Sequence, residues 1–112
     1  MDTGYKADKE KNRLDLWPVT PYLKVGEVLT YGANKYAPDN WRGGMAWSRL
    51  YAATLRHLMA WWMGQSKDPE SGISHLAHAA CNLMFLIEYE ESKLGTDDRR
   101  INTDNSPAIH NS

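Results

Sequence analysis

Residues 75–87 of the sequence read HLAHAACNLMFLI, and this stretch decides the fold. Placed on a helix, it is apolar nearly all round, apart from a polar seam formed by His75, His78 and Asn82. These three residues follow the spacing i, i+3, i+7 and therefore share one face. A helix that is apolar on most sides lies in the middle of a bundle. The stretch therefore predicts an all-α fold in which this helix is central.

Helix start and stop signals on either side of this stretch predict three main helices. The segment 68–70, Asp-Pro-Glu, provides a cap, a first-turn proline and a first-turn acid, so the central helix should begin there and stop before Gly95. A Thr-Pro pair at 20–21 is a good start for the first helix, and Gly64 is a good end for the second. The predicted helices span about residues 21–36, 46–63 and 68–94.

The helices cannot complete a bundle within one chain. The second predicted helix carries a broad apolar stripe that includes Tyr51, Leu55, Leu58 and Trp62. Three helices in 112 residues are too few to surround a helix that is apolar nearly all round. We therefore expect a homo-oligomer, a dimer or a tetramer, to complete the burial. Residues 1–95 should form a single helical domain with an extended N-terminal arm (1–19), and residues 96–112 a flexible polar tail.

Composition and charge argue against several classes of protein. The formal net charge is −1 and the sequence has no continuous basic stripe, which disfavours binding to nucleic acid. No apolar run reaches the roughly 18–20 residues of a membrane span, and the first residues lack the apolar core of a signal peptide. The single Cys81 excludes an intrachain disulfide and indicates a small core residue in a reducing compartment. We expect a cytoplasmic protein without a membrane partner.

Histidines on the second and third predicted helices form the sharpest candidate site. The short connection at 64–67 makes these helices antiparallel neighbours, so His57 can face His75, His78 and the turn at Glu70. Imidazoles at i, i+3 together with a carboxylate can bind a divalent transition metal. Such a metal polarises a phosphate and generates a hydroxide nucleophile. Alternatively, the histidines cap helix ends and form hydrogen bonds inside a core, and the spacing alone leaves both readings open.

Basic side chains form a second candidate site, for phosphate groups. They lie on the N-terminal arm, at the end of the first helix and on the reverse face of the second: Lys6, Lys11, Arg13, Lys35 and Arg56. Basic side chains more often only solvate a surface. Arg56 stands between small alanines, which leaves room for a phosphate or equally for the carboxylate of another helix.

The loop at 37–44 carries an amide and an indole, Asn40 and Trp41. Such groups can read the edge of a nucleobase and stack on its face. The alternative is that Trp41 packs on the bundle while Asn40 holds a turn. The sequence contains no phosphate-loop motif, dinucleotide fingerprint, serine nucleophile elbow or paired cysteines.

Seven short motifs follow one another between Lys6 and Glu88: Lys6-x-Asp8, Lys11-x-Arg13-Leu14-Asp15-Leu16, Tyr31-Gly32-Ala33-x-Lys35-Tyr36, Asn40-Trp41, Arg56-His57-Leu58 with Trp61-Trp62-x-Gly64, Asp68-Pro69-Glu70-Ser71-Gly72, and His75-Leu76-Ala77-His78-Ala79-Ala80-Cys81-Asn82. In these motifs the chain resembles the phage dATP/dGTP diphosphohydrolases, a family similar to the MazG-like all-α pyrophosphohydrolases. The resemblance implies hydrolysis of a purine deoxynucleoside triphosphate, dATP or dGTP, between its α and β phosphates, which gives the monophosphate and pyrophosphate. It also implies a role in phages whose DNA carries 2-aminoadenine, where such enzymes drain dATP and supply dGMP.

One departure from this pattern concerns the metal. MazG-like enzymes bind magnesium with the acidic motifs E-E-x-x-E and E-x-x-D on consecutive helices. The corresponding places here hold Arg56-His57-x-x-Ala60 and His75-x-x-His78, and the nearby carboxylates are Glu27, Asp68 and Glu70. Magnesium prefers oxygen ligands, so histidine ligation favours Mn²⁺, Co²⁺ or Zn²⁺. Either the metal differs, or Glu27 and Glu70 hold Mg²⁺ while the histidines contact phosphate or the attacking water.

The resulting hypothesis is a metal-dependent hydrolase whose site lies between the second and third helices. The expected catalytic residues are Glu70, His75 and His78. With His57 and Glu27, they are also the expected ligands of a divalent ion, Mg²⁺, Mn²⁺ or Co²⁺. Asn40, Trp41 and Asn82 are expected to contact the base or sugar, and the basic side chains named above the phosphates. The alternative is a non-catalytic helical module that binds a nucleotide or a protein, in which the polar seam is structural.

Overall fold

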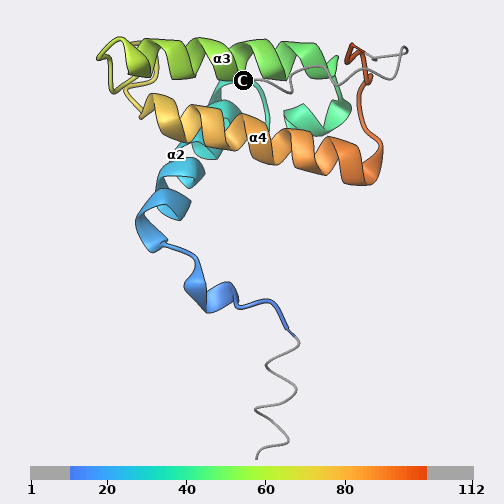
Figure 1. Cartoon of the computed structure of the whole chain (residues 1–112), viewed down its shortest axis with the longest axis horizontal. Helices are drawn as coiled ribbons and strands as arrows, with labels where there is room; N and C mark the ends of the chain where they lie inside the picture. Colours follow the sequence, from blue (N-terminus) through green and yellow to red (C-terminus); the bar gives the residue numbers. More distant parts are fainter. Residues whose placement is uncertain (1–10, 101–112) are drawn as a thin grey trace, which may run out of the picture.

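The computed structural model describes residues 11–100 and is all-α, as the sequence predicts. Its three α-helices are α2 (Val19–Lys35), α3 (Trp47–Trp62) and α4 (His75–Ser92), and the short 3-10 helices η1 (Leu14–Leu16) and η2 (Asn40–Gly43) precede α2 and α3. In Figure 1, α3 and α4 lie side by side, while α2 crosses α4 and projects away from the pair. Residues 11–100 contain no strand, only two isolated backbone bridges. Completion of the bundle by further copies of the chain stays a prediction.

The central position belongs to α4, which packs on both α3 and α2. Its buried side chains include the small residues Ala77, Ala79 and Cys81, and small contact residues allow helices to lie close together. From α3, Leu50 and Thr54 are buried, and the Thr54 hydroxyl donates to the Leu50 carbonyl. Cys81 is the core residue that the sequence predicts, and its burial raises the pKa of its thiol to about 11.

The predicted start of the central helix at Asp68 is wrong, because α4 begins at His75. The N-cap is Ser74, whose side chain accepts hydrogen bonds from the backbone N–H groups two and three positions further on. Asp68 caps a turn instead, since its carboxylate accepts from the N–H of Glu70 at 2.7 Å. Gly72 then adopts a φ of +74°, a left-handed conformation that interrupts a helix. The segment between α3 and α4 is therefore an ordered loop.

The chain after α4 packs against the start of α3, so the first residues of the predicted tail 96–112 are held in place. The Trp47 indole donates to the carbonyl of Leu94 at 2.8 Å. The carboxylate of Asp98 accepts from the N–H and the hydroxyl of Ser48. Asp98 thereby satisfies an N–H at the first turn of α3, where the helix itself offers no partner. The remainder of the predicted tail, 101–112, lies outside the described residues.

Much of the apolar surface of α3 and α4 is exposed in the single chain. The apolar stripe predicted on the second helix faces outward in part, with Tyr51 60% and Trp62 78% exposed, because α3 turns Leu50 and Thr54 toward the interior. On α4, Ile87 is 60% exposed. These apolar side chains do not form a membrane span: among residues 11–100, every helix is too short or too polar to cross a bilayer.

Candidate functional site

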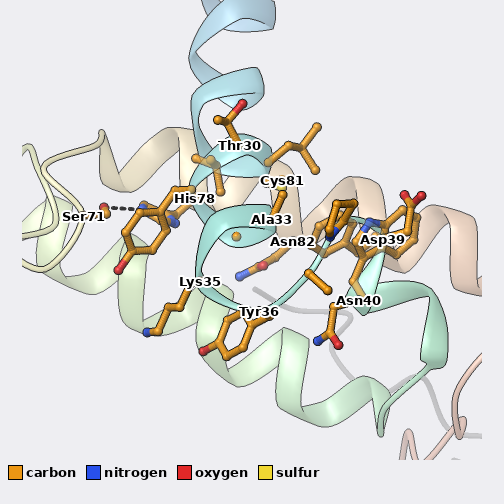
Figure 2. A pocket seen from close by; sticks show the side chains of 18 of the residues that line it. Thr30, Ala33, Lys35, Tyr36, Asp39, Asn40, Ser71, His78, Cys81 and Asn82 are labelled. Carbon is orange, nitrogen blue, oxygen red and sulfur yellow. Dashed lines mark hydrogen bonds between the residues drawn. The ribbon is translucent and has the colours of Figure 1, made fainter.

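A cavity of about 660 Å³ lies among the C-terminal half of α2, the loop that follows it, and the facing sides of α3 and α4. From α4 it is lined by His78, Asn82 and Phe85, whose spacing i, i+4, i+7 places them on one helix face. In Figure 2, Ser71 and His78 lie toward one side of the cavity and Asn40 toward the other. The volume falls within the roughly 300–1,000 Å³ of small-molecule sites.

Three imidazoles from α3 and α4 gather at the polar side of this cavity. His57 Nδ1 lies 2.8 Å from His75 Nδ1, and the ring of His57 stacks on that of His78 with a centroid distance of 4.6 Å. The structure thus brings together the three histidines that the sequence singles out. His75 lies behind the cavity wall at 4% exposure, while His57 and His78 line the cavity.

Burial decides the charge of the two histidines that line the cavity. It lowers the pKa of His57 below its ordinary value near 6.5, and the neighbouring imidazoles lower it further. Burial also lowers the pKa of His78, against a smaller opposing effect of Asp68. At neutral pH both rings are therefore mostly uncharged, the form in which a ring nitrogen can accept a proton or bind a metal.

The loop between α3 and α4 fixes Asp68 beside these rings. The N–H of Asp68 donates to the carbonyl of Ile73, and the N–H of His75 donates to that of Ser66, both at 2.9 Å. One carboxylate oxygen of Asp68 accepts from backbone N–H groups, and the other lies 3.8 Å from His57 Nδ1. Although burial acts to raise its pKa, the bonds from the N–H groups of residues 70 and 71 leave the pKa of Asp68 below its ordinary value. The carboxylate is therefore ionised at neutral pH.

Asp68 is a site residue that the sequence does not single out. The sequence predicts a helix start at Asp68 and offers it only as a nearby carboxylate, whereas the structure places it in the cavity wall. The signal that could identify it is its place in the segment that joins the helices of His57 and His75.

Ser71 anchors His78 from the same loop. The Ser71 hydroxyl oxygen lies 2.7 Å from His78 Nε2 and also accepts from the N–H of Ile73 at 3.2 Å. A hydroxyl oxygen has two lone pairs, so that of Ser71 can accept both the Ile73 N–H and an N–H at His78 Nε2, which leaves the lone pair of the neutral ring on His78 Nδ1. This contact fixes the orientation of His78 at the cavity wall.

Glu70, an expected metal ligand and catalytic residue, is bound to α2 instead. Its Oε1 lies 2.6 Å from Lys35 Nζ and accepts from the Tyr31 hydroxyl at 3.1 Å. The bond to Lys35 is the main cause that lowers the pKa of Glu70, and the same bond raises the pKa of Lys35. All three residues line the cavity, so the pair places one cation and one anion at its wall.

Among residues 11–100, Lys35 is the expected phosphate ligand that lines the cavity. Lys11 and Arg56 are exposed and do not line it, and Arg13 forms an exposed pair with Asp15. Lys6 lies outside the described residues. The structure therefore does not gather the predicted cationic cluster within one chain, because η1 and the start of α2 extend away from the α3 and α4 pair (Figure 1).

The expected base-binding residues do line the cavity. Asn40 is exposed and Asn82 half-buried. The Trp41 ring stacks on Phe85 with a centroid distance of 4.3 Å, and the Arg42 guanidinium lies 4.5 Å from the same ring centre. Trp41 thus packs on the bundle, which is the alternative that the sequence left open, and at the same time it forms part of the cavity wall.

The acidic magnesium cage of MazG-like enzymes does not form within residues 11–100. The group of three ligand side chains found there is His57, Asp68 and His75, and it contains one carboxylate. Glu27 pairs with Lys24 on α2 at 3.3 Å and is not part of the cavity wall. It precedes Lys35 by eight residues, about 12 Å along a helix axis. Because magnesium prefers oxygen ligands, the residues present do not fit it.

Comparison with known proteins identifies the family. The sequence model of the family described as dATP/dGTP diphosphohydrolase, N-terminal, matches residues 1–99. The chain belongs to this family. A relative, the dATP/dGTP diphosphohydrolase of Salmonella phage PMBT28, is 37% identical over 98 residues, which are 88% of this chain and 33% of that protein. The resemblance expected from the seven motifs is confirmed.

The match covers only part of this relative, since the chain spans about a third of its length. No solved structure is a significant match to the chain. The geometry of the cavity therefore has to be interpreted from this chain's own residues.

Proposed function

We propose that the chain acts on a purine deoxynucleoside triphosphate, dATP or dGTP, and hydrolyses it to the monophosphate and pyrophosphate. The observation that carries the proposal is the cavity in which an ammonium group, a neutral imidazole and two amides converge: Lys35, His78, Asn40 and Asn82. The name of the phage relative supports the reaction and the purine preference. A cavity of this size, lined by aromatic side chains and by convergent polar groups, is typical of a site for one small molecule.

The phosphates would bind at the polar side of the cavity. Lys35 would leave Glu70 and pair with a phosphate oxygen, since both anions compete for the same ammonium group. His78 would accept a proton from the water that attacks the α phosphorus. The water oxygen forms a bond to the α phosphorus, the bond from that phosphorus to the bridging oxygen breaks, and pyrophosphate leaves with the electron pair.

The base would lie at the aromatic side of the cavity. Asn40 and Asn82 offer amide donors and acceptors toward the edge of a purine, and the Trp41 and Phe85 stack offers an apolar wall. The two purines present the same ring faces, so discrimination between them depends on these amides.

We also propose that copies of the chain assemble, as a dimer or a tetramer. The exposed apolar side chains of α3 and α4 support assembly, because a contiguous apolar surface is normally covered by a partner. Lys11, Arg13 and Arg56, which do not line the cavity of their own chain, would then be available to the site of a neighbour.

The reaction can be tested with the purified chain. It would be incubated with each of the four deoxynucleoside triphosphates and with Mg²⁺, Mn²⁺, Co²⁺ or Zn²⁺, and products would be separated by ion-exchange chromatography. We expect monophosphate and pyrophosphate in equal amounts from dATP or dGTP. His78→Ala should reduce turnover about 100-fold or more while the far-ultraviolet circular dichroism stays unchanged. If neither dATP nor dGTP gives monophosphate and pyrophosphate, the proposal is contradicted.

A non-catalytic nucleotide-binding module is the second candidate. It is favoured by one observation, that the chain spans about a third of the phage relative. It predicts that dATP or dGTP binds in calorimetry without turnover. It also predicts that His78→Ala weakens folding without a separate catalytic defect.

The biological setting that we propose is phage nucleotide metabolism in the host cytoplasm. There the reaction would drain dATP and supply dGMP for DNA that carries 2-aminoadenine. Comparing the nucleotide pools of infected cells with and without the gene would test this setting.

A further inference from the structure

We propose that His57, Asp68 and His75 form a binding site for one divalent transition-metal ion. The ligand atoms are an imidazole nitrogen from each histidine and a carboxylate oxygen, and they lie within 4.8 Å of one another. The set differs from the one expected from the sequence, because Asp68 replaces Glu27 and Glu70, and His78 bonds with Ser71. Two imidazoles with one carboxylate are a ligand set that Zn²⁺ and Co²⁺ accept.

In two of these ligands, the polar atom that would not bind the ion already forms a hydrogen bond. The amide oxygen of Gln65 lies 2.7 Å from His75 Nε2, so this nitrogen donates and leaves the lone pair on Nδ1. Asp68 Oδ1 accepts from the N–H of Glu70, which leaves Oδ2 directed toward His57. Such outer partners fix the tautomer and orientation of metal ligands. His75 and Asp68 are therefore already oriented as ligands of a metal ion would be.

The distances between the ligand atoms are close to those of a metal centre. The two Nδ1 atoms are 2.8 Å apart, and His57 Nδ1 is 3.8 Å from Asp68 Oδ2. Two nitrogens that each lie about 2.0–2.1 Å from one tetrahedral ion are about 3.3 Å apart. The nitrogens therefore have to separate by only about 0.5 Å. Rotation of the half-buried His57 ring can widen the distance between the two nitrogens, while backbone hydrogen bonds of the loop hold Asp68 and His75.

The ion would have one open coordination position, which would face the cavity. His57 and Asp68 line the cavity, whereas His75 lies behind them. Three protein ligands with an open fourth position are typical of catalytic rather than structural zinc sites. That the open position would meet a phosphate oxygen or the attacking water rests on the proposed function. The binding of the ion itself does not.

The experiment measures metal binding by the full chain in the absence of nucleotide. After treatment with a chelator and desalting, Zn²⁺ is titrated in a calorimeter, and Co²⁺ is followed by its visible absorption. We expect one ion per chain, a Co²⁺ spectrum typical of four-coordination, and a rise in melting temperature that millimolar Mg²⁺ does not produce. Asp68→Asn and His57→Gln should each weaken Zn²⁺ binding at least tenfold.

A matched control is His78→Gln, which changes an adjacent imidazole outside the proposed ligand set and should bind Zn²⁺ as tightly as the parent chain. Absence of stoichiometric Zn²⁺ or Co²⁺ binding, or wild-type affinity in Asp68→Asn, would overturn the metal site. Hydrolysis of a purine triphosphate by a parent chain that binds neither Zn²⁺ nor Co²⁺ would reject the metal site and keep the proposed function. Tight Zn²⁺ binding by a chain that hydrolyses no nucleotide would keep the metal site and reject the proposed function.

Discussion

Under the proposed function, the Lys35 side chain would serve the free chain and a bound substrate in turn. In the free chain its ammonium bonds with Glu70, and both side chains are largely exposed. An exposed pair of this kind stabilises a fold by only about 0–1 kcal/mol. Exchange of the Glu70 carboxylate for a phosphate group on Lys35 would therefore cost little free energy. The ammonium group of Lys35 already lies at the cavity wall.

Substitutions in this pair should separate binding from stability. Lys35→Met removes a charge-assisted bond to phosphate, so we expect the KM for the purine triphosphate to rise about tenfold or more. Glu70→Gln removes the competitor and should lower KM a few-fold. Steady-state kinetics measure both, and urea unfolding should show changes below about 1 kcal/mol. Equal effects of the two substitutions on KM would argue against competition for Lys35.

At this scale the sequence predicts some site residues and misses others for a physical reason. The proximity of His57, His75 and His78 follows from two adjacent antiparallel helices, and the structure confirms this proximity, although the connection between the helices is longer than predicted. The roles of Asp68 and Glu70 depend on the path of the loop, which is set by its backbone hydrogen bonds. Local sequence spacing does not determine such a path. The sequence therefore could not show that Asp68, rather than Glu70, lies beside the imidazoles.

Among the elements, the N-terminus of α4 depends on Ser74. Its side chain accepts two backbone N–H groups of the first turn. Ser74→Ala should therefore reduce the free energy of unfolding by about 1 kcal/mol, measured by urea denaturation. The control is Ser92→Ala at the exposed C-terminal end, whose hydroxyl donates to the carboxylate of Glu88 one turn earlier. A loss as large in Ser92→Ala as in Ser74→Ala would show that capping is not the cause.

The ends of α2 and α3 agree with the sequence prediction within two residues, whereas the start of α4 does not. Asp68 and Ser74 are both good N-cap residues, so the sequence offers two starts for one helix. The backbone bridge between Lys67 and Ser74 selects the later one, because it fixes the loop before the helix begins. The buried face of α3 was also ambiguous, since its apolar stripe is broader than the face that is buried.

The start of α3 should make stability depend on pH through Asp98. Bonds from the hydroxyl and the N–H of Ser48 hold the pKa of Asp98 below its ordinary value near 3.8. The unfolded chain then binds the proton more readily, so stability rises with pH. The contribution is present above the ordinary pKa and is lost as the pH falls through the lower value of the folded chain.

Asp98→Asn tests this dependence. The difference in melting temperature between the parent chain and Asp98→Asn should be constant from pH 7 to pH 5 and should shrink as the pH approaches 3. Glu91→Gln, a change at an exposed carboxylate, should track the parent chain across the same range. A difference that is independent of pH would contradict the assigned role of Asp98.

At the scale of the molecule, residues 11–100 measure 51 × 43 × 31 Å along their principal axes. Its outer apolar side chains support assembly, and α4 offers a place to test it. Ile87→Lys puts a charge on an exposed apolar position, which a buried interface would not tolerate. We expect light scattering after size-exclusion chromatography to give an oligomer for the parent chain and a smaller species for Ile87→Lys. Glu91→Lys should leave the mass unchanged, and a monomeric parent chain would reject the assembly.

The attachment of α2 has a consequence for the passage of molecules into the cavity. α2 contacts α4 less extensively than α3 does, and the exposed bonds of Tyr31 and Lys35 to Glu70 tie it to the loop. Of the three helices around the cavity, α2 is therefore the one that we expect to detach at the lowest cost in free energy. Under the proposed function, a nucleotide would enter and depart by a swing of this helix, and the opening of the wall that carries Lys35 would set the rate of product release.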